Sequence, residues 1–376
     1  MQAILLAAVV VLAQPAPPSR DDAASGVPLL LAKMAEAVLS ADAERYLSLV
    51  DPTEPEFAKE QENWAKDFVE RPTAAFALDL DGGLLVEVDG GNAAIGTLTV
   101  RWQMPERPER TIRHAARFTN RDGTWLYAGE AWKRVASNDG SNIALYLDDA
   151  LRDVAVNVVE LLPEVREHVN AGFETPLDHV QVVKIYGEME HLQASIFLSY
   201  EDALGGWNEP GESIKILATP RSPARQLRVL LAHEYGHVAT FSMGDRATEI
   251  PWWVAEGAAE LAAERYSGRS GPESVDRMIR QLAEQGGLAE WDLLSDFRNT
   301  RPEHGMLVYK QGQHMLGYVS GRFGRSARNQ WIARMTRGQS LDEATRGAFG
   351  MTFADLDRDW RASLLAAASD GEDEAQ

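Results

Sequence analysis

The residues best suited to catalysis form one short run, His233-Glu234-Tyr235-Gly236-His237, inside an apolar segment with helical spacing. Residues four positions apart lie on one face of a helix, so both imidazoles can bind a single Zn²⁺ ion. Glu234 lies about 100° around the helix from His233, where it can stand beside the ion without binding it. A carboxylate at that position can accept a proton from a zinc-bound water.

The next predicted helix has Pro251 in its first turn and contains a carboxylate, Glu256. Eighteen residues separate His237 from Glu256. Cysteine is absent from the chain, so any metal ion must be bound by histidine and carboxylate side chains. Imidazole and carboxylate ligands suit Zn²⁺.

These motifs resemble those of a known family, the gluzincins, which are the branch of the peptidase MA superfamily that includes thermolysin and aminopeptidase-N-like enzymes. The resemblance rests on the spacing from His237 to Glu256 and on the run Trp-x-x-Glu-Gly-x-Ala at residues 253–259, and it covers roughly residues 140–368. It implies an α+β fold with a mostly helical zincin-like catalytic domain and a small mixed sheet. It also implies a zinc-dependent peptidase that hydrolyses peptide bonds with a metal-activated water.

The resemblance further implies a role for each residue of the motif. His233, His237 and Glu256 would bind the zinc ion, and Glu234 would be the general base and then the acid that protonates the leaving amine. Glu260, one turn after Glu256, matches a carboxylate that holds a ligating imidazole in thermolysin-like enzymes. The alternative for Glu260 is a solvated carboxylate on a charged helix face.

A donor to the oxyanion is predicted in a later segment. Residues 309–312, Tyr-Lys-Gln-Gly, resemble the Tyr-x-x-Gly segment that supplies a catalytic tyrosine in aminopeptidase-N-like gluzincins. Tyr309 is therefore the candidate donor, and a packing tyrosine is the alternative. His304 and His314 flank the segment, and each is either a residue of the active-site cleft or a structural histidine.

Two further features bear on the substrate. Residues 205–219 precede the zinc-binding helix, where gluzincins have an edge strand that pairs with an extended substrate. An ordinary strand is the alternative. The G-x-M-E-N segment that grips the free amine in aminopeptidase-N-like enzymes is absent, which argues against aminopeptidase activity.

Trp252 and Trp253 are expected to be core residues that fix the approach of the second helix.

The beginning of the chain predicts export. Residues 3–13 form an apolar run that suits a secretion signal and is too short to span a bilayer, which takes about 20 residues. We expect a signal peptide at residues 1–13 and a flexible leader at 14–26. The protein would then be secreted or periplasmic, with no integral membrane span after removal of the signal. An uncleaved apolar tail is the alternative.

The pattern from residue 27 predicts a separate N-terminal domain. Helical stretches are followed by period-two segments with turns at residues 81–83, 89–91 and 122–123. This order resembles nuclear-transport-factor-like (SnoaL-like) α+β cone domains. We place such a domain at residues 27–136, a linker at Ser137–Ser141, a catalytic domain at 142–368 that opens with a helix from Asn142 to Asn170, and an acidic disordered tail at 369–376.

The composition narrows the range of partners. The 376-residue chain has 57 acidic and 37 basic residues and a formal net charge of −20. Nucleic acid and anionic membranes repel such a surface, so we expect no nucleic acid as a partner. A peptide or protein substrate is what the resemblance to the gluzincins implies. The N-terminal domain would either inhibit the chain's own active site or bind a partner. The alternative to an enzyme is a non-catalytic zinc-stabilised scaffold or binding module.

Overall fold

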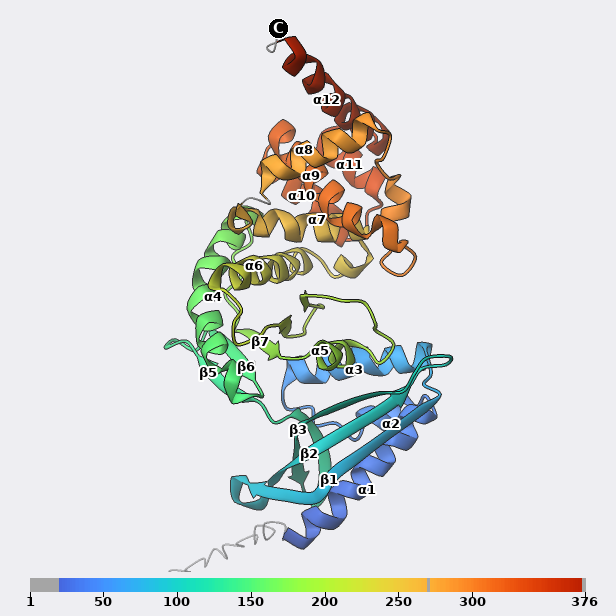
Figure 1. The fold of residues 1–376 in the computed structure, drawn as a ribbon, viewed down its shortest axis with the longest axis vertical. Helices are drawn as coiled ribbons and strands as arrows, with labels where there is room; N and C mark the ends of the chain where they lie inside the picture. The colour runs from blue at the N-terminus through green and yellow to red at the C-terminus, as the bar shows by residue number, and fades with distance from the viewer. Residues whose placement is uncertain (1–19, 269–270, 374–376) are drawn as a thin grey trace, which may run out of the picture. The chain divides into compact units, whose positions relative to one another are not determined.

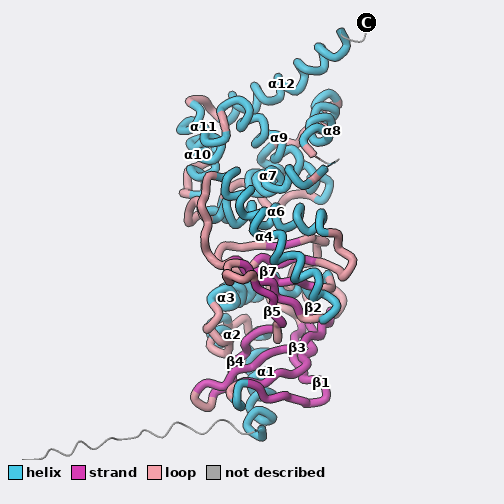
Figure 2. Tube along the Cα trace, turned by 90° about the vertical axis from the view of Figure 1, so that its left-hand side faces the viewer, coloured by secondary structure: helices cyan, strands magenta, loops and turns pink. Residues whose placement is uncertain are grey.

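The computed structural model describes residues 20–268 and 271–373. The expected signal peptide at residues 1–13 lies outside the described residues. In the part of the chain that is described, no helix combines the length and the apolar character needed to cross a membrane. The fold is α+β, mostly helical with two small sheets (Figures 1 and 2).

The chain divides into two compact units. The N-terminal unit runs to Ala131 and also includes Phe197–Ser199, and the C-terminal unit comprises Trp132–Ile196 and the chain from Tyr200 onwards. The division therefore comes earlier in the sequence than the linker expected at residues 137–141.

The N-terminal unit has helices first and an antiparallel sheet afterwards. The sheet has the order β1-β2-β3-β4, with every pair antiparallel. Its core combines aliphatic and aromatic side chains, and the aromatic ones include Phe68, Trp102 and Phe118. The elements are α1 (Arg20–Leu39), α2 (Ala43–Leu47), α3 (Pro55–Glu70), β1 (Ala75–Val88), β2 (Ala93–Gln103), β3 (Arg110–Arg121) and β4 (Thr124–Glu130).

Two expectations for this unit are wrong. The second half of the leader predicted at residues 14–26 is helical, because α1 begins at Arg20. The turn predicted at residues 81–83 is an irregularity within β1, whose register against β2 shifts between Leu80 and Leu85. An Asp-Gly-Gly run favours a turn locally, but the neighbouring strand continues past it and keeps both halves in one strand.

A distant segment completes the N-terminal unit. The Trp102 indole nitrogen donates to the Leu198 carbonyl oxygen over 2.9 Å, and the Ser199 hydroxyl donates to Asp67 over 2.7 Å. The Asp67 carboxylate is buried. The two hydrogen bonds explain why Phe197–Ser199 belongs to this unit.

The C-terminal unit contains a five-stranded mixed sheet in the order β5-β6-β7-β9-β8. Strands β6, β7 and β9 run parallel, and β5 and β8 are antiparallel at the two edges. The central strands are almost wholly buried, as expected for strands covered on both faces. The strands are β5 (Lys133–Ala136), β6 (Asn142–Tyr146), β7 (Gln181–Tyr186), β8 (Gly206–Trp207) and β9 (Ile214–Leu217).

Helices make up the rest of this unit. In both views α6 lies between the sheet and α7, and α9 packs against α7 (Figures 1 and 2). The expected capping box at Ser340 and Glu343 is present at the start of α11. The helices are α4 (Arg152–Phe173), α5 (Met189–Ile196), α6 (Ala224–Phe241), α7 (Trp252–Ala263), α8 (Pro272–Glu284), α9 (Gly305–Phe323), α10 (Arg325–Thr336), α11 (Leu341–Phe349) and α12 (Phe353–Asp373).

Three expectations for this part of the chain are also wrong. Residues 137–141 form the turn of the β5–β6 hairpin rather than a linker. Residues 142–146 are strand β6, so the helix expected from Asn142 begins only at Arg152. The tail expected to be disordered from residue 369 is helical as far as Asp373.

Glycines set the distance between α7 and α9. A Cβ atom added at Gly257 would lie 2.8 Å from the Gly312 carbonyl oxygen and 2.9 Å from the Gln313 nitrogen. One added at Gly312 would overlap with the Trp253 carbonyl oxygen. The two backbones therefore touch at a glycine–glycine crossing, and this contact fixes the position of α9 beside α7.

We expect Gly257→Ala to lower the free energy of unfolding by about 1–3 kcal/mol, because backbone atoms cannot move aside for the methyl group. Gly317→Ala on α9 is the matched control, since its Cβ would meet no atom within 4 Å. The control should be neutral or stabilising by up to about 1 kcal/mol through helix propensity. Urea unfolding of both variants measures the difference, and equal effects would contradict the crossing.

Candidate metal centre

The close approach of α6 and α7 brings the two halves of the sequence motif together. Gly236 lies between the two histidines on α6, and a Cβ there would be 2.9 Å from both Ala259 Cα and Ala262 Cβ on α7. Only glycine fits at this crossing without displacing α7. The histidine face of α6 consequently meets the face of α7 that carries Glu256.

Three ligand atoms converge at this crossing. Glu256 Oε2 lies 3.2 Å from His233 Nε2 and 3.5 Å from His237 Nε2, and the ligand atoms of the three residues all lie within 4.8 Å of one another. Two atoms that bind one zinc ion tetrahedrally at about 2.0–2.1 Å are themselves about 3.3 Å apart. Both distances to Glu256 therefore match the edges of a zinc tetrahedron.

The hydrogen bonds of Glu256 leave one oxygen for a cation. Oε1 accepts a hydrogen bond from the Trp252 indole nitrogen at 2.9 Å. Oε2 is buried and has no partner with hydrogen-bond geometry among the described residues. A buried carboxylate oxygen without a donor is costly, and a cation between it and the imidazoles removes that cost. The residues present thus fit a divalent metal ion.

The charges of the site also favour a cation. Burial by itself lowers the pKa of His233, but the neighbouring carboxylates of Glu256 and Glu260 and the charge of Glu234 outweigh it and raise the pKa to about 10. Burial raises the pKa of Glu256, but the two imidazoles more than offset this and hold it well below its usual range. The carboxylates therefore attract positive charge to the position where the ligand atoms meet.

Glu260 lies on the far side of His233 from Glu256. Its Oε1 is 3.4 Å from His233 Nδ1, and its Oε2 forms an ion pair with Lys310 of α9. The side chain is only 19% exposed, so it faces the imidazole rather than solvent. A carboxylate on Nδ1 fixes the orientation of the ring and its tautomer, which leaves Nε2 available to a metal ion.

We expect Glu260→Gln to weaken metal binding by about 10–100-fold without abolishing it. Glu264→Gln is the matched control, because Glu264 is four residues further on and contacts Gln313 instead of a histidine. Competition with a chromophoric chelator at fixed pH gives both affinities. An affinity for Glu260→Gln equal to that of the control would show that Glu260 does not support the ligand.

Glu234 is next to the three candidate ligands, and its carboxylate is not in the group of converging atoms. It is 3% exposed, and a Cβ added at Gly206 of β8 would overlap with its Oε1. Burial raises the pKa of Glu234, an effect that the two imidazoles oppose and Glu256 reinforces. The edge strand thus runs directly past this carboxylate, and the glycine makes the close approach possible.

Tyr309 lies near His233 and Trp252. Its ring centre is 6.1 Å from that of His233 and 6.1 Å from that of Trp252. Burial raises the pKa of its hydroxyl, and Glu256, Tyr200 and Glu234 raise it further, so the phenol keeps its proton. Gly312, the glycine of the Tyr-x-x-Gly segment, is the residue at which α9 crosses α7. This explains why Tyr309 and Gly312 occur together in one segment.

The flanking histidines are not part of the ligand group. His314 Nδ1 accepts a hydrogen bond from the Trp360 indole nitrogen at 3.0 Å, and its Nε2 lies 3.0 Å from Asp276 Oδ1. It is a structural histidine between helices. His304 ends the short turn that precedes α9.

Sequence reasoning missed several residues of the site. Trp253 is buried as expected, but Trp252 is half-buried and binds Glu256 rather than serving only as a core anchor. Nothing in the local pattern indicates Gly206 or Lys310, since each reaches the site from another element. The run of glycine and alanine at residues 257–259 was the one signal in the sequence for a close approach of two helices.

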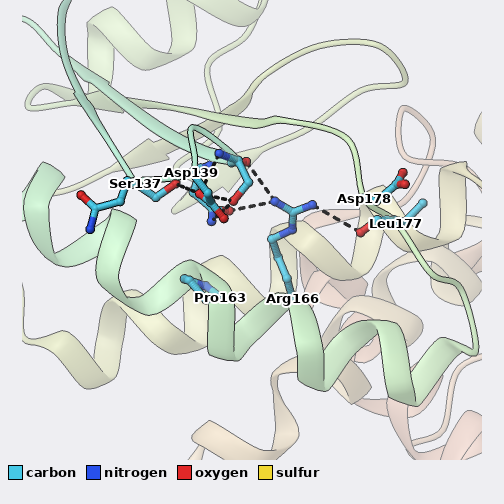
Figure 3. A pocket seen from close by; sticks show the side chains of 9 residues that line it. Ser137, Asp139, Pro163, Arg166, Leu177 and Asp178 are labelled. Atoms are coloured by element: carbon cyan, nitrogen blue, oxygen red, sulfur yellow. Dashed lines mark hydrogen bonds between the residues drawn. The ribbon is translucent and has the colours of Figure 1, made fainter.

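A cavity of about 580 Å³ lies elsewhere in this unit, beside the β5–β6 turn (Figure 3). Arg166 points into it from α4, and makes five hydrogen bonds that use all five N–H groups of a guanidinium. One of them, 3.3 Å long, reaches the Tyr235 hydroxyl on α6. The arginine therefore supports the metal-binding helix and has no donor left for a ligand. The cavity is lined by Ser137, Asn138, Asp139, Ser141, Asn142, Pro163, Arg166, Leu177 and Asp178.

Comparison with known families places the chain in a recognised superfamily. A model of the peptidase MA superfamily matches residues 165–366, which is more than half of the chain. The chain belongs to the peptidase MA superfamily, and this membership indicates a peptidase of the metal-dependent type. A search of curated proteins finds no match.

Proposed function

We propose that the protein is a zinc-dependent peptidase of the gluzincin type, with His233, His237 and Glu256 as the zinc ligands. The observation that carries the proposal is the position of Glu256 Oε2, 3.2 and 3.5 Å from the two imidazole Nε2 atoms. The residue lies on a second helix, so the convergence requires the fold as well as the motif. Family membership supports the peptidase class independently.

Zn²⁺, when bound, supplies a Lewis acid that polarises the scissile carbonyl and makes water more acidic. Glu234 accepts the proton of the attacking water and later donates it to the leaving amine. A pKa raised by burial suits a group that must both take and return a proton near neutral pH. Tyr309 keeps its proton and donates a hydrogen bond to the oxyanion.

The edge strand β8 is proposed to bind the main chain of the peptide. It pairs with β9 on one side, through Gly206 with Ile216 and Trp207 with Lys215, and it is the last strand of the sheet. An extended peptide can add to the other side as a further strand. Because Gly206 packs on Glu234, a peptide paired there would pass the general base and the metal ligands.

The test of this proposal combines metal analysis with mass-spectrometric mapping of cut sites in a peptide mixture. If the protein is a zinc peptidase, it should bind one zinc ion per chain and cleave peptide bonds in the mixture. Stoichiometric zinc with no cleavage of any peptide would favour a non-catalytic zinc-stabilised scaffold.

We also propose that the protein acts outside the cytoplasm and that its N-terminal unit is a nuclear-transport-factor-like cone that restrains the active site. The apolar run at residues 3–13 supports export. The helices-then-sheet order of the N-terminal unit supports the cone.

If the N-terminal unit restrains the active site, a specific protease site inserted between Ala131 and Trp132 should raise peptidase activity after cleavage, in a product that stays folded by circular dichroism. The position follows the division between the units. The uncut insertion variant is the control. An unchanged rate would favour the rival role, in which the unit binds a partner.

A further inference from the structure

The second residue of the Tyr-x-x-Gly segment, Lys310, has no role in the mechanism above. It lies on α9, between Tyr309 and the glycine at which α9 crosses α7. Its side chain is 27% exposed and forms an ion pair with Glu260 of α7. Lys310 is thus a partly buried cation next to a carboxylate that contacts one of the candidate metal ligands.

Glu260 divides its two carboxylate oxygens between partners on two other helices. Oε1 lies 3.4 Å from His233 Nδ1 on α6, and Oε2 pairs with Lys310 on α9. The contact with the imidazole is longer than the usual range of about 2.7–3.2 Å for an N–H···O hydrogen bond, so it is weak by itself. The ion pair with Lys310 supplies the second contact that holds the carboxylate beside the ring.

The same stretch of α9 also contacts His233 directly. The Tyr309 ring centre lies 6.1 Å from that of the imidazole, and the two ring planes are inclined by 31°. Consecutive residues of a helix point about 100° apart, so Tyr309 can face the imidazole while Lys310 faces Glu260. Both contacts depend on the glycine crossing that fixes α9 beside α7.

Lys310 affects a bound cation in two opposite ways. Its positive charge repels the ion through space, and for that reason alone its removal should tighten metal binding. Its hold on Glu260 keeps the carboxylate against the imidazole, and loss of this hold should weaken metal binding. Ordering a free glutamate side chain lowers an equilibrium constant by about 10-fold. The sign of the change in affinity therefore distinguishes the two effects.

We propose that Lys310 is a positioning residue of the metal centre, which orders Glu260 against His233 Nδ1 before the ion binds. This inference rests on the metal ligands of the proposed function and adds a residue to their support. Glu260 is 19% exposed, so without Lys310 its carboxylate can turn to water. The imidazole would then lose the partner that sets its orientation and tautomer. A site that is ordered in advance binds more tightly, because less conformational freedom is lost on binding.

The experiment uses the full-length protein and two metal ions as probes. Zinc affinity is measured by competition with a chromophoric chelator at fixed pH, and the visible absorption spectrum of bound Co²⁺ reports the geometry of the ligands. Lys310→Met and Lys310→Gln remove the charge, and Lys310→Arg keeps it. Arg277→Met, at an exposed position of α8, is the control for the loss of one positive charge. Circular dichroism checks that each metal-free variant is folded.

We expect Lys310→Met and Lys310→Gln to weaken zinc binding by about 3–10-fold and to change the Co²⁺ spectrum, because the imidazole is held less firmly. Lys310→Arg should restore both, since a guanidinium also pairs with a carboxylate. In the Glu260→Gln background, Lys310→Met should cause no further weakening, because the carboxylate that Lys310 holds is already absent. Arg277→Met should match the wild type.

Contrary results for the positioning role are equally specific. Unchanged or tighter zinc binding by Lys310→Met would show that Lys310 does not order the site. A weakening that persists in full in the Glu260→Gln background, or that Arg277→Met reproduces, would also overturn the proposal. These measurements need no turnover, so each of these results leaves the peptidase function intact. The expected affinities and spectra in a protein that cleaves no peptide would support the role of Lys310 and contradict the peptidase function.

Discussion

Glu234→Gln is expected to lower peptide hydrolysis by about 10²–10⁴-fold while one zinc ion per chain remains bound. Glutamine has the shape of glutamate and fits the same buried position against Gly206, but it cannot accept the proton of the attacking water. A loss of 10³-fold corresponds to about 4 kcal/mol of transition-state stabilisation. Because Glu234 is not a ligand, the three residues that face the ion are untouched.

The measurement for this variant is kcat/KM on a peptide that the wild type cuts, together with zinc content by atomic absorption. Glu264→Gln serves as the control for removal of a carboxylate in the same unit and should keep wild-type activity. Residual activity within a few-fold of the wild type would remove Glu234 from the mechanism. Loss of zinc in Glu234→Gln would instead place Glu234 among the ligands.

Glu256→Gln is expected to have the largest effect on the metal. The substitution keeps an oxygen for the Trp252 indole but removes the charge that faces His233 and His237. The fall in zinc affinity should exceed the about 10–100-fold loss typical of residues that only orient a ligand. Peptidase activity should fall with it at limiting zinc.

Thermal unfolding gives an independent reading of the same variant. A ligand that binds only the folded protein stabilises it by about 4 kcal/mol when its free concentration is about 1,000 times Kd. Zinc should therefore raise the Tm of the wild type markedly and that of Glu256→Gln much less. A shift with zinc that is the same for both proteins would mean that the ion binds elsewhere in the chain.

The group of three candidate metal ligands was predictable because its residues lie within a short stretch of sequence. Two histidines four apart on an apolar helix must share a face, and Glu256 follows at a fixed spacing on the next helix. The start signals of later helices, such as Ser340 with Glu343, are equally local and are confirmed by the capping box. The type of fold, α+β and mostly helical, was implied by the resemblance to the gluzincins and is confirmed.

The errors arose where a local pattern fits two structures. The run at residues 137–141 is rich in Ser, Asn, Asp and Gly, which suits both a linker and a hairpin turn, and pairing of β5 with β6 decides between them. The apolar residues of 142–146 fit a helix as well as a strand, because short apolar runs do not distinguish the two. Parallel pairing with β7, about forty residues later, determines the outcome.

The surroundings of the metal could not be predicted for a related reason. Lys310 reaches Glu260 only because α7 and α9 cross at two glycines, and Tyr200 meets Phe297 across nearly one hundred residues of sequence. Such contacts depend on tertiary packing, which cannot be predicted from the spacing of residues in the sequence. They are also the contacts that would tune the affinity and the specificity of the site.

The most direct test of the account is zinc K-edge X-ray absorption on the purified, zinc-loaded protein. The account predicts one zinc ion per chain with four nitrogen or oxygen neighbours at about 2.0–2.1 Å, among them the scattering pattern of two imidazoles. In Glu256→Gln, this first shell should change or the zinc should be lost. A wild-type spectrum without two imidazoles, or one identical in Glu256→Gln at full zinc occupancy, would contradict the convergence of α6 and α7 on one ion.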